Sequence, residues 1–329
     1  MLPAGFLRRV AADGATAMHT EEYMEQVPLS AYAKPGLMLS QIWPKARDTE
    51  GETLRGLEAA LEWPCFEIFH MVDVCFPVER ASISRIVRER DLDVTYGLSR
   101  IANHGGLGLS DLDETARQRA IDGHAAAFES AREIGARYVQ VNSGPAPRDP
   151  ERRVEALRWL EDSLRALVEA AAPDLQLLIE PLDVAVHKKG SLGYTPEAVR
   201  LCETLPGLAL CVDTAHMTLN EEAILGLLPA LRPHVGEFHF CNCVTTPGHP
   251  LHGDHHVPFG PPGALDIAAV GKIMAEAVNV GLFQRERRPR VFCEVRRTNG
   301  HTVEEVMRHS WSVLETGWEM AVTASGQPS

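Results

Sequence analysis

The sequence lacks a surplus of positive charge. It contains 32 Lys and Arg against 45 Asp and Glu, which gives a net charge of −13 at pH 7. Because phosphate binding relies on clustered Lys and Arg, this balance argues against a nucleic-acid-binding surface. The partner that we expect is therefore a small molecule and not a nucleic acid.

Long apolar runs are missing as well. No run is long enough to cross a membrane, and no stretch near the start has the apolar h-region of a signal peptide. The seven cysteines are an odd number, and most lie inside apolar strand-like runs, as reduced thiols in a protein core do. We therefore expect a cytoplasmic protein with no membrane partner.

Two further absences concern domain organisation. No linker rich in Gly, Ser or Pro divides the 329 residues. No GxGxxG motif follows the first strand-like run, which counts against a dinucleotide-binding fold. Since residues 1–34 show no sustained periodicity, we predict an N-terminal extension over 1–34, a single domain over 35–323 and a tail over 324–329.

What the sequence does contain is a regular alternation of apolar runs and amphipathic segments. The segments between the runs carry apolar residues at three- and four-residue spacing, which is typical of helices packed on one face. The strand-like runs occupy residues 37–43, 65–74, 92–99, 138–144, 175–181, 208–214, 235–241 and 291–296. Eight strands that alternate with helices predict a (β/α)8 TIM barrel, an α/β fold, rather than an open sheet.

Each of the last four runs carries a residue that can bind a metal close to its end. These residues are Glu180, Asp213, His239 and Glu294. In a barrel, strand ends meet around one axis, so the four side chains would point at one spot. A single acid at a strand exit could equally be a helix cap, but four at matching positions predict a metal site. Three carboxylates and one imidazole suit Mn²⁺, Mg²⁺, Co²⁺ or Zn²⁺.

Other candidates lie on the loops that follow the strands. His216 comes three residues after Asp213 and could hold a substrate oxygen beside the metal, or face solvent. Lys188 could receive an anionic group of a substrate, although a loop lysine is often only solvated. The longest irregular segment is 245–266, which we expect to cover the substrate.

Asp254 and His256, inside that long segment, are candidates for a second metal site or for a lid over the substrate. Cys241 and Cys243 share the strand parity of His239, but alternate inward positions of a barrel strand are usually core. We therefore interpret the two cysteines as core residues and not as ligands.

These motifs resemble the xylose isomerase-like TIM barrel superfamily, and in particular its ketose 3-epimerase-like branch. The resemblance is carried by IEP at 179–181, DTAH at 213–216, His239, the DxH of Asp254 and His256, GPPG at 260–263, and Glu294. The superfamily also includes hydroxypyruvate isomerases, inosose dehydratases and DNA repair enzymes of the endonuclease IV type.

The resemblance implies one divalent metal ion, with Mn²⁺ expected and Mg²⁺, Co²⁺ or Zn²⁺ as alternatives. Its ligands would be Glu180, Asp213, His239 and Glu294. The two glutamates would also be the catalytic residues, which transfer a proton through a metal-bound enediolate. His216 and His256 would bind the substrate.

Two departures from the family pattern matter for function. Ketose epimerases commonly carry an arginine shortly after the strand-seven histidine, whereas CNCVTTPG follows His239 here; Arg296 could supply that charge. In the endonuclease branch, further histidines on early strands complete a metal cluster. Here strand four ends in Asn142, and His70 and His104 are uncertain substitutes, so DNA repair is not expected.

The sequence therefore predicts a metal-dependent isomerase or epimerase of a sugar or keto-sugar-like substrate. A lyase or dehydratase acting on a keto-sugar or inosose begins with the same loss of a proton beside a carbonyl, so it remains an alternative. A non-catalytic metal- or ligand-binding accessory protein is a second alternative. A homo-oligomer also remains open.

Overall fold

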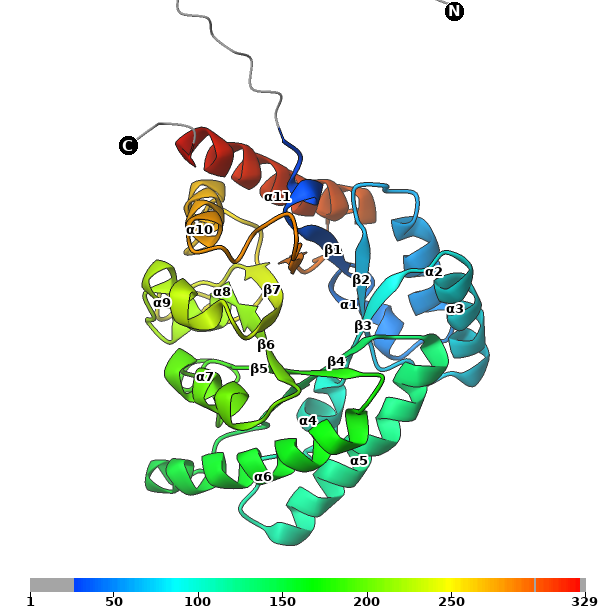
Figure 1. Ribbon diagram of the computed structural model, residues 1–329, viewed down its shortest axis with the longest axis vertical. Helices are drawn as coiled ribbons and strands as arrows, with labels where there is room; N and C mark the ends of the chain where they lie inside the picture. The colour runs from blue at the N-terminus through cyan, green and yellow to red at the C-terminus, as the bar shows by residue number, and fades with distance from the viewer. Residues whose placement is uncertain (1–26, 299, 326–329) are drawn as a thin grey trace, which may run out of the picture.

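The computed structural model describes residues 27–298 and 300–325. Its centre is a closed barrel of eight parallel strands that follow one another in chain order (Figure 1). The strands are β1 (Lys34–Met38), β2 (Ile68–Val72), β3 (Asp93–Gly97), β4 (Tyr138–Asn142), β5 (Gln176–Glu180), β6 (Leu208–Asp213), β7 (Val235–Cys241) and β8 (Arg290–Glu294). The predicted (β/α)8 TIM barrel is confirmed. Most of the predicted extension and tail lies outside the described residues.

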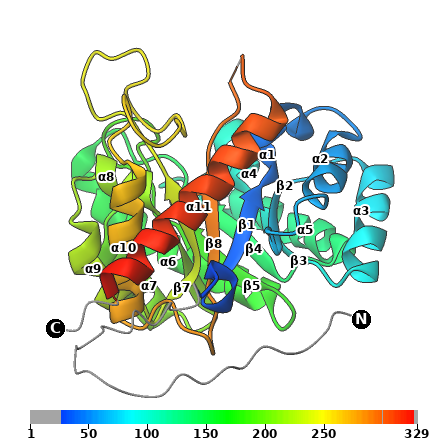
Figure 2. The same cartoon turned by 90° about the horizontal axis from the view of Figure 1, so that it is seen from above.

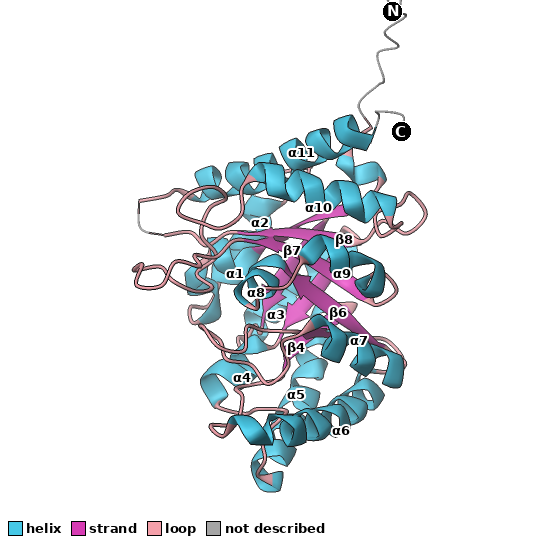
Figure 3. Cartoon of the chain, turned by 90° about the vertical axis from the view of Figure 1, so that its left-hand side faces the viewer, coloured by secondary structure: helices cyan, strands magenta, loops and turns pink. Residues whose placement is uncertain are grey.

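Helices surround the barrel (Figure 3). They are α1 (Leu39–Ile42), α2 (Glu52–Ala60), α3 (Pro77–Glu89), α4 (Ser99–Gly105), α5 (Glu114–Ile134), α6 (Arg153–Ala171), α7 (Thr195–Thr204), α8 (Thr214–Leu219), α9 (Ile224–Leu231), α10 (Ile267–Asn279) and α11 (Val303–Ser325). Short 3-10 turns span Leu29–Ala31, Pro44–Arg47 and Pro150–Arg152. Among the described residues, no helix combines the length and the apolar character needed to span a membrane.

The capping chemistry of α11 follows the sequence pattern. Thr302 and Glu305 form the reciprocal pair predicted by their spacing: the Glu305 N–H donates to Thr302 Oγ1 over 3.2 Å, and the Thr302 N–H donates to Glu305 Oε2 over 2.7 Å. The long helix α5 begins with a simpler N-cap, in which Asp113 Oδ1 accepts from the Ala116 N–H. It ends at Gly135, whose φ of 88° is left-handed.

One predicted strand is wrong in its boundaries. The run 37–43 was expected to be the first strand, but β1 ends at Met38 and residues 39–42 form the single turn α1. All seven residues of the run are buried, so hydrophobicity alone could not distinguish a buried strand from a buried helical turn. The turn has a functional consequence, because it brings Ser40 and Gln41 to the mouth of the barrel.

A buried ionic network closes the other end of the barrel. Arg290 Nε lies 3.0 Å from Glu237 Oε1, and the same guanidinium also pairs with Asp93. The guanidinium stacks 3.9 Å from the ring centroid of Tyr138. Buried charges are tolerated only when they are paired and hydrogen bonded, as these are. The network fixes Glu237 directly beneath the strand-end residues.

The carboxyl ends of the strands meet at the opposite end. In the strand register, Asn142 lies beside Glu180, Asp213 beside His239, and Cys241 beside Glu294. Figure 2 shows the connections that follow β7 and β8 projecting from this same end. The polar strand ends predicted from the sequence are therefore gathered at one mouth.

Candidate active site

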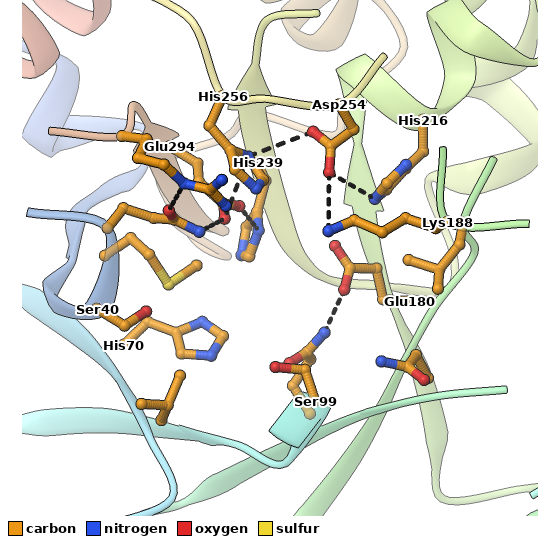
Figure 4. A pocket seen from close by; sticks show the side chains of 17 residues that line it. Ser40, His70, Ser99, Glu180, Lys188, His216, His239, Asp254, His256 and Glu294 are labelled. Atoms are coloured by element: carbon orange, nitrogen blue, oxygen red, sulfur yellow. Dashed lines mark hydrogen bonds and ion pairs between the residues drawn. The ribbon is translucent and has the colours of Figure 1, made fainter. Parts of the chain in front are cut away.

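A pocket opens at the carboxyl ends of the strands (Figure 4). Its lining comes from every part of the barrel: Met38, Ser40, Gln41, His70, Val72, Ser99, Gln140, Asn142, Glu180, Leu182, Lys188, His216, His239, Asp254, His256, Glu294 and Arg296. Polar side chains dominate this list. Such a pocket suits a small, hydroxyl-rich ligand better than an apolar one.

The four predicted ligands lie close together. Potential ligand atoms of Asp213, His239 and Glu294 are all within 4.8 Å of one another. Those of Glu180, Asp213 and His216 meet the same limit, so the two groups overlap at Asp213. Donors from β5, β6, β7 and β8 thus converge on one region.

One carboxylate oxygen of Asp213 is available to bind a metal. Its Oδ1 caps α8 by accepting the N–H groups of Ala215 (2.7 Å) and His216 (3.1 Å). Its Oδ2 is buried and has no hydrogen-bond partner among the described residues. A buried carboxylate oxygen without a partner is costly, and a cation would satisfy it. The donor set and this oxygen both fit a divalent metal ion.

The electrostatics point the same way. Burial and the neighbouring carboxylates of Asp213 and Glu294 raise the pKa of Glu180 to about 7, although His216 opposes the rise. Burial also raises the pKa of Asp213 to about 6, with Glu294 and Asp254 adding to the effect. Carboxylates that repel one another in a buried place are the arrangement that a metal relieves.

Glu237 orients the imidazole of His239. Glu237 Oε2 lies 3.1 Å from His239 Nε2, and the Arg290 network holds that carboxylate from below. The other ring nitrogen, Nδ1, lies 3.2 Å from Glu294 Oε2. A carboxylate that fixes one nitrogen of a ligand histidine sets the direction of the other. His70 Nδ1 is 3.6 Å from the same Glu237 oxygen.

Each glutamate is held by a glutamine. Gln140 Nε2 donates to Glu180 Oε2, and Gln41 Nε2 donates to Glu294 Oε1 over 2.7 Å. Arg296 reaches Glu294 only indirectly: its Nε donates to Gln41 Oε1 over 3.0 Å. Arg296 therefore supports Glu294 through Gln41 while lining the pocket.

The remaining candidates form a second polar group on the wall nearest β6 and β7. Lys188 Nζ lies 3.2 Å from Asp254 Oδ2, and His216 Nε2 lies 3.9 Å from the same oxygen. His216 Nδ1 is also 3.4 Å from Asp183 Oδ2. His256 Nδ1 lies 3.4 Å from Asp254 Oδ1. Burial opposes a charged His216, but Asp254 and Asp183 raise its pKa to about 10.

Cys241 adjoins the site more closely than a plain core residue would. Its Sγ lies 2.9 Å from His256 Nδ1 and 3.8 Å from Asp254 Oδ1. Both cysteines pack in a small apolar cluster with Ala215 and Leu219, but only Cys241 also contacts polar groups of the site. The core interpretation thus describes Cys243 better than Cys241.

Several polar residues of the site were not predicted, among them Glu237, Gln140 and Gln41, which orient the predicted ligands. The sequence pattern contains a signal for the first two. Glu237 and Gln140 stand two residues before His239 and Asn142, so strand periodicity points them into the barrel as well. Gln41 left none, because it lies in the run that was taken for a strand. Of the uncertain histidines, His70 lines the pocket, whereas the side chain of His104 lies outside the described part of the chain.

A comparison with protein families assigns the chain to one family. The family model for the xylose isomerase-like TIM barrel matches residues 57–308. The chain belongs to this family. No curated protein is similar enough to count as a match.

Solved structures of similar fold include several sugar epimerases. A D-tagatose 3-epimerase-like protein is 14% identical, with 89% of this chain and 100% of that chain covered and a TM-score of 0.68. A 3-keto-D-glucoside 4-epimerase from E. coli is 19% identical, with 86% and 99% covered and a TM-score of 0.63.

A third structure, the IOLI protein with a zinc atom, is 16% identical, with 88% of this chain and 98% of that chain covered and a TM-score of 0.65. At identities this low, the TM-scores establish that the fold is shared. The buried His, Glu and Asp clusters described above are what indicates a divalent metal site in this chain.

Proposed function

We propose that this protein is a divalent-metal-dependent isomerase or epimerase of a sugar or keto-sugar. The observation that carries the proposal is the placement of two glutamates, Glu180 on β5 and Glu294 on β8, each hydrogen bonded to a neutral amide. A glutamine amide orients a carboxylate without removing its basicity as an arginine would. Two such groups on different sides of one pocket can remove and return a proton (Figure 4).

Glu180, Asp213, His239 and Glu294 would hold the metal ion. When bound, a divalent ion acidifies a C–H group beside a carbonyl and stabilises the negative charge that forms there. The spare Oδ2 of Asp213 and the mutual repulsion of the carboxylates support this ligand set. Mn²⁺ is the ion that we propose, with Mg²⁺, Co²⁺ and Zn²⁺ also compatible with these donors.

The two glutamates differ in how readily they hold a proton. The pKa of Glu180 is raised to about 7, whereas, despite burial, His256 and His239 lower the pKa of Glu294. Two carboxyl groups whose environments push their pKa values apart can divide the roles of proton donor and proton acceptor. We propose that the glutamate facing the C–H bond of the substrate accepts the proton. The other glutamate returns a proton from the opposite face of the same carbon.

The other polar groups would bind the oxygens of the substrate. His216, His256, Lys188 and Arg296 line the pocket with N–H groups, which suits hydroxyl and carbonyl acceptors. The sugar epimerases of the same fold support a carbohydrate as the ligand. The long connection after β7 contributes Asp254 and His256 to the wall and so helps to exclude water.

Deuterium exchange tests the proposal. The Mn²⁺-loaded protein is incubated in D₂O with ketoses, 3-keto sugars and inososes, and each sugar is analysed by mass spectrometry. We expect one substrate to gain a deuterium beside its carbonyl, and the product then separates an epimerase from an isomerase or a lyase. Glu180→Gln should lose the exchange, whereas Glu58→Gln, exposed on α2, should keep it. Equal exchange by Glu180→Gln and the wild type would contradict the proposed role of Glu180.

A further inference from the structure

A second set of metal-type donors lies beside the first. Cys241 on β7 and Asp254 and His256 on the following loop place a thiol, a carboxylate and an imidazole within 4.8 Å of one another. All three residues are buried. Sulfur, nitrogen and oxygen in this combination are donors that Zn²⁺ and Co²⁺ accept. The proposed one-metal function gives this cluster no metal of its own.

A lysine pairs with the carboxylate of this cluster. The ammonium of Lys188 lies 3.2 Å from Asp254 Oδ2, an oxygen of a fully buried side chain. In Figure 4, the Lys188 side chain reaches across the pocket wall to Asp254. The same Asp254 oxygen lies 3.9 Å from His216 Nε2. Cys241 Sγ and His256 Nδ1 lie against the other oxygen of this carboxylate, Oδ1, at 3.8 and 3.4 Å. The lysine therefore neutralises, from the Oδ2 side, the carboxylate that a second metal ion would share with the thiol and the imidazole.

The loop that carries Lys188 is anchored from within. Asp183, which is fully buried, accepts the backbone N–H groups of Val186, His187 and Lys188. A backbone fixed in this way limits the directions open to the lysine side chain. The ammonium is therefore a fixed part of the pocket lining and not a freely solvated surface group.

The charges around the pocket agree with a single metal ion. Four carboxylates face it, from Glu180, Asp213, Asp254 and Glu294, and two permanent cations, Lys188 and Arg296, line it. His216 lies between Asp183, at 3.4 Å, and Asp254, at 3.9 Å, and the charge of Asp183 balances its own. The two cations leave two negative charges, which one divalent ion neutralises. A second divalent ion would create a buried excess of positive charge.

We propose that Lys188 is a resident cation that keeps the Cys241, Asp254 and His256 cluster free of metal, so that the pocket holds one divalent ion. Removal of the ammonium converts this cluster into a second site for Zn²⁺ or Co²⁺. Without the ammonium, the charge of Asp254 is available to a divalent ion, which would bind its Oδ1 together with the thiolate of Cys241 and the imidazole of His256. Binding of that ion releases the thiol proton.

The number of bound metal ions tests this proposal. The reduced full-length protein is loaded with Co²⁺, freed of excess ion by gel filtration, and analysed by elemental mass spectrometry and absorption spectroscopy. We expect about one Co²⁺ per chain in the wild type and in Lys188→Arg, which keeps the charge. Lys188→Met should bind about twice as much and show a new thiolate-to-cobalt charge-transfer band.

Two second-site variants make the assignment specific. Cys211 also lies near His239, so the diagnostic signal is the part of the band that Cys241→Ser removes. Adding Asp254→Asn to Lys188→Met should return the metal content to about one ion per chain. Circular dichroism verifies folding, and Lys188→Gln replaces Lys188→Met if the latter does not fold.

A Cys241-dependent band in the wild type, or an unchanged metal content in a folded Lys188→Met variant, would overturn the proposal. Neither readout depends on turnover of a sugar. A failure of the proposed isomerase function would therefore leave this result standing, and the reverse also holds.

Discussion

At the scale of single residues, the site is built from groups that destabilise the empty protein. Glu180 is the clearest case. Burial and the neighbouring Asp213 and Glu294 raise its pKa to about 7 from an ordinary value of 4.5. In the folded protein the carboxyl group therefore keeps its proton at pH values where the unfolded chain has lost it. The ionisation of Glu180 costs folding free energy as the pH rises from about 4.5 to 7.

Glu180→Gln should therefore stabilise the metal-free protein, and more so at high pH. In chelator, we expect the free energy of unfolding of the variant to match that of the wild type near pH 5. At pH 8 the variant should be more stable by about 1 to 3 kcal/mol, because the neutral amide avoids the cost of a charge in this pocket. Denaturant titrations at a series of pH values measure the difference.

Glu58→Gln, on the exposed face of α2, serves as the control for this titration series and should show no such trend. If Glu180→Gln were equally destabilised at both pH values, Glu180 would be stabilising the fold as an ordinary hydrogen-bonded residue.

Metal-binding residues are easier to recognise in the sequence than the residues that orient them. The four proposed metal ligands could be found because each lies at or near the end of an apolar run, where an ionisable group has few structural reasons to exist. They are Glu180, Asp213, His239 and Glu294. Glu237 could not be recognised with the same ease, since its partner Arg290 lies 53 residues further along the chain. The pairing depends on the closure of the barrel, which no local pattern contains.

At the scale of elements, the strand-to-helix connections set the shape of the mouth. The strands themselves were predictable because parallel barrel strands are continuous apolar runs. The boundary between β1 and α1 was not, since both lie in fully buried chain. The turn α1 is nevertheless what supplies Gln41 to Glu294, so a boundary error of a few residues concealed a contact of the site.

The connection after β4 depends on close contact between two backbones. Gly144 has a φ of 78°, and a Cβ atom there would lie 2.5 Å from Cα of Gly108, in the loop before α5. Gly144→Ala should therefore combine backbone strain with a clash that no side-chain rotation relieves. We expect a loss of about 2 to 4 kcal/mol in the free energy of unfolding, measured by denaturant titration.

Gly226→Ala is the matched control for this substitution. Gly226 is exposed inside α9 and has open space around its Cβ direction, so alanine should leave stability unchanged or raise it by up to about 1 kcal/mol. Equal stability of Gly144→Ala and the wild type would mean that the two loops can separate without cost.

At the scale of the whole molecule, the proposed metal site joins half of the barrel. Its four donors come from β5, β6, β7 and β8, which are neighbours in the closed sheet. In the unfolded chain the same residues are spread over more than a hundred positions, so only the folded protein offers the complete site. Metal binding and folding of the barrel are therefore linked.

Thermal unfolding should report this linkage. At pH 7.5 we expect the melting temperature to rise with the logarithm of the Mn²⁺ concentration, with one hundred times the dissociation constant adding about 2.7 kcal/mol of stability. The rise should be smaller at pH 5.5, because Glu180 and Asp213, with pKa values raised to about 7 and about 6, must release protons when the ion binds. Asp213→Asn should lose most of the rise, whereas Asp122→Asn, exposed on α5, should keep it. The same rise in Asp213→Asn as in the wild type would place the stabilising ion elsewhere in the molecule.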